Sequence, residues 1–129
     1  MADLYLLFNH AMTPEQEREA REVLEVDSIH EPPPDIRFLW QAIPSDAATL
    51  EEVLSPVFAW LENTLHPGDY LLVQGEHGAT CLVVHHAHEK GIIPIYATTR
   101  RQAEEQRLDD GSVRLVHTVR HVRFRTYGK

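Results

Sequence analysis

The sequence of residues 69–101 most constrains what this chain can fold into. It reads DYLLVQGEHGATCLVVHHAHEKGIIPIYATTRR and predicts a buried strand over residues 70–74, a helix that ends near Lys90, and a second buried strand over residues 92–97. A strand, a helix and a strand in this order close almost always by a right-handed crossover, so the two strands should be parallel. The polar segments that follow the strands then leave the sheet at one edge, where ligands bind in open α/β sheets.

The N-terminal part of the chain adds elements of the same kind. The apolar run at residues 4–8 is too short for a helix and predicts a first strand. Thr13 and Gln16 form a capping box around a proline, which predicts a helix over residues 14–24. Three consecutive prolines end a short second strand at residues 26–30, because proline cannot donate a hydrogen bond to a sheet.

Three further helices are expected from apolar spacing and turn signals. Two lie over residues 35–41 and 47–65, the second with a kink or a break at Pro56. The third lies over residues 100–108 and ends at the turn Asp109-Asp110-Gly111.

The C-terminal segment completes an α/β pattern. Apolar residues alternate over residues 113–119 as in a strand, and the alternation changes phase near Arg120, which predicts a bulge or a break there. Five strand-like segments interleaved with helices predict a single three-layer α/β domain of Rossmann-like architecture over residues 1–129. Its sheet should be mainly parallel and should end in a C-terminal strand or hairpin. A chain of 129 residues is long enough for one core.

The charges argue against long nucleic acid as a partner. The net charge is −8, which repels an extended polyanion. Residues 1–90 carry 4 basic and 16 acidic side chains, whereas residues 91–129 carry 8 basic and 4 acidic ones. This division fits either a small anion held at one basic place on an acidic body or a scatter of solvated charge.

Membrane insertion and export are not expected. No apolar run is long enough to span a bilayer, and the start MADLYLLF lacks the basic region of a signal peptide. The single Cys81 cannot form an intrachain disulfide. A cytoplasmic protein is therefore the simplest expectation.

The turn after the first strand of the central unit is a candidate anion site. The glycines let the backbone approach a ligand closely, and the N–H groups at the start of the next helix attract an anion. The alternative is a tight turn that needs glycine for backbone reasons alone. The pattern matches neither the GxGxxG fingerprint nor a P-loop. The candidate binding residues of this turn are Gln74, Gly75, Glu76, Gly78, Ala79 and Thr80, with His77 between them.

A second candidate site follows the second strand. Thr98, Thr99, Arg100 and Arg101 offer two hydroxyls and two positive charges at what should be a helix start. Cations there oppose the helix dipole, and local conflicts of this kind are typical of functional sites. The alternative is a solvated arginine pair. Asn9 and His10, which end the first strand, should reach the same edge, where His10 can move a proton near neutral pH unless it is only a surface residue.

A third group of residues resembles a metal site but is not predicted to be one. Cys81, His85 and His88 share a helix face, with His86 adjacent. Nothing here matches a known ligand spacing, and this helix should pack on the sheet. Cys81 and one histidine are therefore expected in the core or in an interface, and neither a metal nor a cofactor is predicted.

Several segments together resemble a known family. The first strand running into FNHAMTPEQ, then HPGDYLLVQGEHGAT, GIIPIYATTRR, and the closing DGSVRLV and HVRFRTY, are similar to a family of small CRISPR-associated proteins found beside type III systems. The resemblance covers nearly the full length and is weakest over residues 26–46. Such proteins resemble the CRISPR-associated Rossmann-fold (CARF) domains that bind cyclic oligoadenylate messengers, and some are ring nucleases that linearise these messengers.

The resemblance implies a homodimer, because a symmetric ring suits a two-fold site. Our hypothesis is that the dimer binds cyclic tetra-adenylate and cleaves it by attack of a ribose 2′-hydroxyl, without a metal. Arg100 would stabilise the charge on the phosphorus, and His10 or His77 would move the proton. Arg123 and Arg125, on the face opposite Val122 and Phe124, are reserves for the same role. The alternatives are a binding protein that only sequesters the ring and an enzyme that acts on nucleotides or sugar phosphates.

Overall fold

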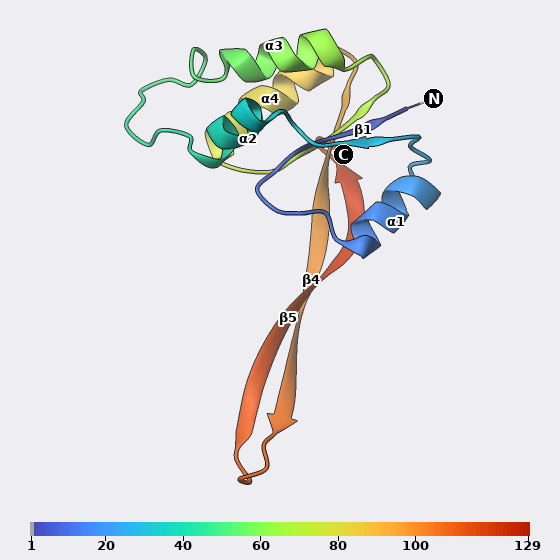
Figure 1. Ribbon diagram of the computed structural model, residues 1–129, viewed down its shortest axis with the longest axis vertical. Coiled ribbons are helices and arrows are strands. Elements are labelled where there is room, and N and C mark those ends of the chain that lie inside the picture. The colour runs from blue at the N-terminus through green and yellow to red at the C-terminus, as the bar shows by residue number, and fades with distance from the viewer. Residues whose placement is uncertain (1) are drawn as a thin grey trace.

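The computed structural model describes residues 2–129 and shows a small α/β body from which a long hairpin projects (Figure 1). The sheet has the strand order β2-β1-β3-β4-β5. The parallel strands are β1 (Leu4–Leu7), β2 (Ile29–His30), β3 (Tyr70–Val73) and β4 (Ile93–Arg107), and β5 (Val113–Thr126) runs antiparallel to β4. The helices are α1 (Pro14–Glu22), α2 (Pro34–Gln41), α3 (Ser55–Thr64) and α4 (His77–Glu89). This confirms the predicted α/β class with a mainly parallel sheet and a C-terminal hairpin.

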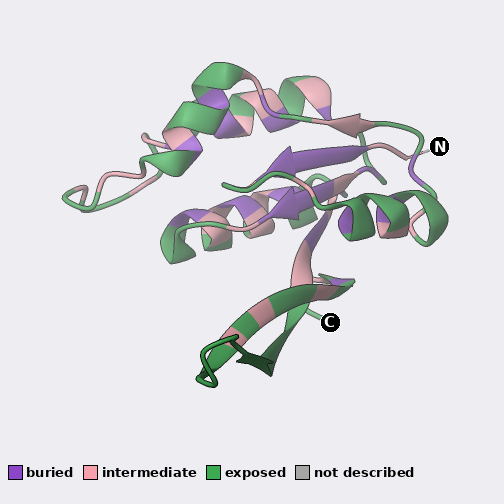
Figure 2. Ribbon diagram, turned by 60° about the horizontal axis from the view of Figure 1, so that its bottom comes forward, coloured by how far each residue is buried: buried purple, intermediate pink, exposed green. Residues whose placement is uncertain are grey.

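The central strands are buried on both faces, which explains their uninterrupted apolar runs. Leu7, Leu71 and Val73 belong to the core cluster with α2, α3 and α4, whereas Leu6 and Leu72 belong to the cluster with α1. The strands between the two helix layers are coloured as buried in Figure 2. Burying each of these side chains contributes about 1.5–3 kcal/mol to folding. The three layers therefore hold β1 and β3 rigidly side by side, with their carboxyl ends at one edge.

The predicted helix starts are confirmed at α1 but not at α3. Thr13 accepts a hydrogen bond from the backbone of Gln16 and completes the capping box. Of the helix expected over residues 47–65, only the part from the break expected at Pro56 onward is present, because α3 begins at Ser55. Pro56 lies in its first turn, where the missing backbone donor costs nothing. The preceding residues form turns and a loop instead.

The helix expected over residues 100–108 is also wrong. Strand β4 continues to Arg107 and pairs with β5 along the whole of this segment. The predicted turn at residues 109–111 is confirmed, with Gly111 at a φ of 87°. The expected irregularity near Arg120 is also present, because Thr98 pairs with Arg123 while Thr99 pairs with His121, which leaves Val122 as an extra residue in β5.

The part of the hairpin beyond this bulge has no layer packed against it. We call residues 99–121 the arm. It leaves the body as a twisted two-stranded ribbon (Figure 1), and nearly all of its residues are exposed (Figure 2). Core packing therefore ends where the arm begins.

The partly buried hydroxyl of Tyr127, just after β5, should make the protein less stable at high pH. Its hydroxyl donates to the carbonyl oxygen of Val73 at 2.6 Å, and burial raises the pKa of this hydroxyl above its ordinary value of 10.0. A raised pKa means that the unfolded chain ionises first. The free energy of unfolding should therefore be constant below a pH of about 10 and fall above it.

Urea unfolding between pH 8 and pH 11 or so measures this effect. The Tyr127→Phe variant should lose stability less steeply over the alkaline part of this range. Burial also raises the pKa of Tyr5, so some of the fall should remain in the variant. An alkaline slope that is identical in the two proteins would contradict the assignment.

Candidate functional site

The two polar segments that follow strands β3 and β4 of the central unit begin at one edge of the sheet, as predicted. Leu72 of β3 pairs with Ile95 of β4, and two residues later the side-chain oxygen of Gln74 accepts a hydrogen bond from the backbone of Ala97 at 3.1 Å. Strand β3 ends here, but β4 continues and becomes the arm. Thr98 therefore lies beside the turn after β3, as expected, although it begins a ribbon and not a helix.

The start of α4 is occupied by its own carboxylate. Oxygens of Glu76 accept hydrogen bonds from the backbone N–H groups of Gly78 at 2.6 Å and Ala79 at 3.4 Å. A negative side chain at this position is stabilised by the helix dipole. The prediction that a phosphate rests on these N–H groups thus requires the Glu76 carboxylate to move aside first.

Gly75 has a packing role that the sequence did not reveal. A Cβ atom on Gly75 would lie 2.6 Å from Nε1 of Trp40, which is closer than carbon and nitrogen can approach. The same Nε1 donates to the carbonyl oxygen of Gln74 at 3.0 Å. Glycine is needed at this position because the indole of Trp40 in α2 packs directly against the turn.

One buried hydroxyl of α4 has no hydrogen-bond partner among the described residues. It is Oγ1 of Thr80, on the face of the helix that also carries His77 and His88. Cε1 of His88 lies 3.8 Å from the point where a Cβ atom on Gly128, just past the end of β5, would lie. This face of α4 is therefore turned toward the β4–β5 side of the sheet.

A basic face lies at the base of the hairpin, and we define it by Tyr96, Thr98, Arg100, Arg120 and Arg125. Tyr96 and Arg125 pair directly, with the guanidinium carbon 5.7 Å from the ring centre and a hydrogen bond of 3.2 Å to the tyrosine hydroxyl. Two residues further along β4, Thr98 pairs with Arg123, and after two more Arg100 pairs with Arg120. Alternate residues of a strand share a face, so these rows follow one another on the same side.

Arg100 and Arg120 are the most unusual pair in this ladder. Side chains directly opposite each other in an antiparallel pair have Cβ atoms about 4.5–5.5 Å apart, and like charges there are destabilising. Neither arginine has a carboxylate partner among the ion pairs of residues 2–129. An anion between the two guanidinium groups would remove this repulsion.

Arg123 pairs with Thr98 in this ladder, but its guanidinium group turns back to its own strand. The Nε of Arg123 donates to the carbonyl oxygen of Phe124 at 3.3 Å, and Arg123 borders a hollow with α1. Thr99 and Arg101 alternate to the opposite face of the arm. The structure thus brings Thr98, Arg100 and Arg125 together and separates Arg101 from them.

Asn9 and His10 reach the same edge but lie in a different hollow. They line a cavity of about 140 Å³ together with Phe8, Arg37 and Gln41. Strands β1 and β4 are separated by β3, so this cavity is on the far side of the edge from the basic face. His77, on the exposed first turn of α4, is the better placed of the two predicted histidines.

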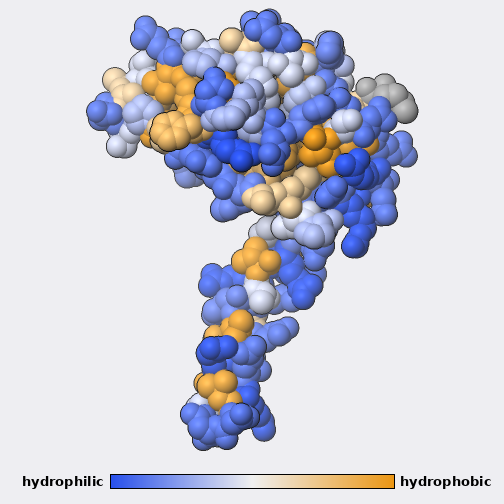
Figure 3. Space-filling view, viewed as in Figure 1, coloured by the Kyte–Doolittle hydropathy of each residue, from blue (hydrophilic) through white to orange (hydrophobic). Residues whose placement is uncertain are grey.

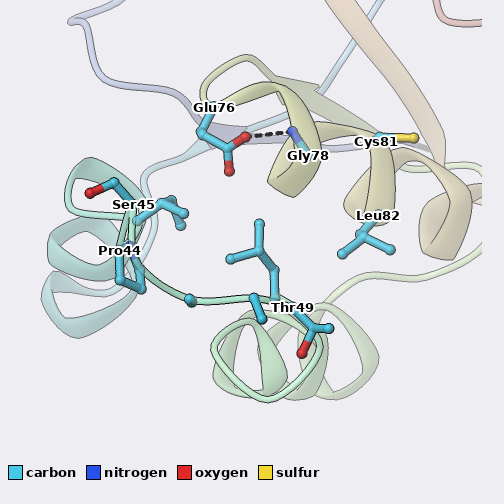
Figure 4. A pocket seen from close by; sticks show the side chains of 11 residues that line it. Pro44, Ser45, Thr49, Glu76, Gly78, Cys81 and Leu82 are labelled. Carbon is cyan, nitrogen blue, oxygen red and sulfur yellow. Dashed lines mark hydrogen bonds between the residues drawn. The ribbon is translucent and has the colours of Figure 1, made fainter.

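A larger hollow near α4 is electrostatically unsuited to an anion. It has a volume of about 690 Å³ and lies between the loop before α3 and the first turns of α4 (Figure 4). Its walls are mostly apolar, and its charged group is the Glu76 carboxylate. Cys81 was expected in the core or in an interface. It is exposed and lines this hollow, so it does not lie in the core.

The histidines of α4 divide between the surface and the packing of α4 against α3. His85 pairs with Glu89 at 2.8 Å, and His86 stacks on Phe58 at 4.7 Å between ring centres. Within residues 2–129, no group of three or more histidine, cysteine, aspartate or glutamate residues is arranged to hold a metal ion. In the same residues no helix is long and apolar enough to cross a bilayer.

Comparison with known proteins places this chain in a family. Residues 2–125 match the model of the Uncharacterized protein MJ1673 family. The chain belongs to the MJ1673 family. It is 39% identical over 127 residues to Uncharacterized protein MJ1673 of Methanocaldococcus jannaschii, and the alignment covers 98% of each chain. No solved structure matches the chain significantly.

The match to the MJ1673 family includes every element of the candidate site. It runs from before β1 to Arg125 and so contains the edge, the basic face and the arm. Because the alignment with the archaeal relative covers 98% of both chains, the arm belongs to the length that the two proteins share.

Sequence reasoning missed two members of the basic face. Arg120 and Tyr96 were not predicted, because the first was assigned to an irregular segment and the second to a buried strand. The signal that would have identified Arg120 is the spacing of arginines in VRHVRFR, read against a continuous β4. Once β4 runs through Arg100, the register places Arg120 opposite it.

Proposed function

We propose that this protein binds a cyclic oligoadenylate, most favourably cyclic tetra-adenylate, on its basic face and linearises the ring. The observation that supports this most is the direct pairing of Arg100 with Arg120, two rows from Arg125, without a carboxylate partner in the described residues. A ligand with several phosphates would convert this repulsion into binding energy, since guanidinium groups bind phosphate in a bidentate manner.

The rest of the chain favours a compact ligand over a long polyanion. The body carries the 16 acidic side chains of residues 1–90, whereas the basic residues gather in the β4–β5 segment. A long strand would be repelled by the body, while a small ring contacts only the basic face. The resemblance of FNHAMTPEQ, QGEHGAT, IYATTRR and HVRFRTY to small proteins of type III CRISPR systems supports an oligoadenylate as this ring.

The proposed reaction is an internal transesterification. A ribose 2′-oxygen attacks the adjacent phosphorus, the bond from phosphorus to the 5′-oxygen breaks, and the products are a 2′,3′-cyclic phosphate and a 5′-hydroxyl. The proton that leaves the 2′-hydroxyl passes to a base, and the 5′-oxygen gains a proton. Arg100 stabilises the charge on the phosphorus, and His77 is the first candidate for proton transfer because His10 lies in a separate cavity.

A homodimer is part of this proposal. A cyclic oligoadenylate repeats one unit, so a two-fold dimer can offer the same patch to it twice. The proposed setting is the cytoplasm, where the messenger would be removed and type III signalling ended.

The test is incubation of labelled cyclic tetra-adenylate with an excess of protein in the presence of a chelator. Linear products with a 2′,3′-cyclic phosphate end are expected from the chemistry above. A ring that is bound but stays intact would overturn the nuclease and support the alternative, a protein that sequesters the messenger. A ring that is neither bound nor cut would overturn both, and binding of mononucleotides in its place would favour an ordinary nucleotide enzyme.

A further inference from the structure

The arm has a second face, which we call the apolar face because its β5 residues are mostly apolar side chains that nothing covers. Along β5, the residues of this face alternate with those that point to the side of the basic face. Val113 and Leu115 are each 56% exposed, and Val119 is 65% exposed. Apolar side chains are visible at intervals along the ribbon in Figure 3. A two-stranded ribbon is marginally stable in water by itself, so a partner that covers this face would stabilise the arm.

The β4 side of the apolar face carries one positive and one negative side chain, placed symmetrically about a central row. Ala103 pairs with His117, and on either side of this row lie Arg101 paired with Val119 and Glu105 paired with Leu115. Arg101 and Glu105 are both two residues from Ala103, with opposite charges. Neither belongs to an ion pair within residues 2–129.

We propose that this face docks against the same face of a second copy of the chain. A two-fold axis in the interface, through the row of Ala103 and His117, reverses the strand direction of the partner ribbon. It therefore brings Arg101 of each copy opposite Glu105 of the other, and Val119 opposite Leu115. Such an isologous contact satisfies both charges and covers the apolar side chains of both arms at once.

This pairing also places the tip of each arm near the body of the other copy. The axis row is four residues from Arg107, just before the turn, and four residues from Thr99, where the arm leaves the body. Both distances are about 13 Å at 3.3 Å per residue. The turn with Asp109 and Asp110 thus comes close to Thr99 and His121 at the base of the partner arm, while Arg100 and Arg120 stay on the uncovered side.

Crosslinking at the axis tests the contact directly. The exposed Cys81 is first replaced by serine, and then a single cysteine is introduced as Ala103→Cys or, as the matched control, Gln102→Cys on the opposite face. Packed ribbons lie about 10 Å apart, within reach of a short bismaleimide. Covalent dimer is expected from the Ala103 variant and not from the Gln102 variant. Equal crosslinking of the two variants would overturn the proposal.

Charge exchange tests the register. Arg101→Glu and Glu105→Arg, each alone, place like charges opposite each other twice and should raise the dissociation constant of the dimer about tenfold. The double variant restores opposite charges and should return the constant toward its original value. The two residues lie about 13 Å apart on one strand, so restoration requires contact between chains. Sedimentation velocity measures this, and a parent chain that stays monomeric, or a double variant as weak as the single ones, would refute the interface.

The inference concerns the arm alone and holds whether or not the protein cleaves a ring. Because this contact leaves the two basic faces on opposite outer sides of the paired ribbons, it is a different contact from the two-fold one proposed above for a shared ring. Ring cleavage is measured on labelled oligoadenylate, whereas dimer formation is measured without ligand. A negative result in the cleavage experiment therefore leaves the dimer proposal standing, and a negative result in the dimer experiments leaves the cleavage proposal standing.

Discussion

Replacement of Arg100 by alanine is expected to lower the rate of ring cleavage about 100-fold, the usual effect of removing one fixed donor to a developing negative charge. The same change should leave the fold intact or stabilise it slightly, because it removes the repulsion between Arg100 and Arg120 in the ladder. Single-turnover cleavage of labelled cyclic tetra-adenylate measures the first effect, and thermal unfolding without ligand measures the second.

A matched control for this change is Arg114→Ala. Arg114 has the same charge and lies on the same face of the arm, but it is near the tip, where it donates to the side chain of Gln106 at 2.8 Å. The Arg114→Ala variant should cleave the ring at nearly the rate of the unchanged protein. Lost cleavage with retained binding in the Arg100 variant would support a role in the reaction, whereas lost binding would support only a phosphate cradle. Equal rates in the two variants would contradict both roles.

The largest expected effect on stability comes from Trp40. Its side chain is 2% exposed and packs between α2 and the turn after β3, so Trp40→Ala should cost about 3–5 kcal/mol of unfolding free energy. Gly75→Ala should cost about 1–3 kcal/mol, because its new methyl group meets the indole. Urea unfolding of the two single variants measures both values.

The double variant decides whether the two effects have one cause. When Trp40 is already alanine, the methyl group of Gly75→Ala meets an empty space, so the second change should cost far less than it does alone. Strictly additive free energies would show that Gly75 is required for another reason, such as close approach of a ligand. The cycle therefore separates the packing role of this glycine from the binding role predicted from the sequence.

The sequence was sufficient to predict most of the body, but not the loop before α3. Strands β1 and β3 are short apolar runs that can only be buried on both faces, and the capping box of α1 is a local signal that the structure reproduces. The parallel pairing of β3 with β4 follows from the crossover through α4. These features depend on neighbouring residues, so no knowledge of distant contacts was needed.

The arm was not predictable from local preference. Residues 100–107 read RRQAEEQR, and nearly all of these residue types favour helix. The pairing of this segment with the β-branched residues of β5 overrides that preference. The same error hid part of the candidate site, since a helix over this segment separates Arg100 from Arg120 and a strand places them side by side.

The apparent convergence of polar residues was correct only in part. The edge of the sheet was predicted correctly for Gln74, which accepts a hydrogen bond from Ala97 next to Thr98, and for Asn9 and His10, which follow β1. The occupation of the α4 N-terminus by Glu76 was not predictable, because a carboxylate in this turn serves equally well as a cap or as a neighbour of a bound ligand.

The open ladder of the arm also bears on aggregation. Strand β3 pairs with β4 only up to Ile95, so along the arm both outer edges carry backbone groups that another strand could pair with. At the other end of the sheet, β2 has only two residues and is followed closely by three prolines, which close that edge. The arginines and glutamates along the arm hinder such growth by electrostatic repulsion. Resistance to edge-to-edge association therefore rests on the charges of the arm, because no strand of the body pairs with these edges.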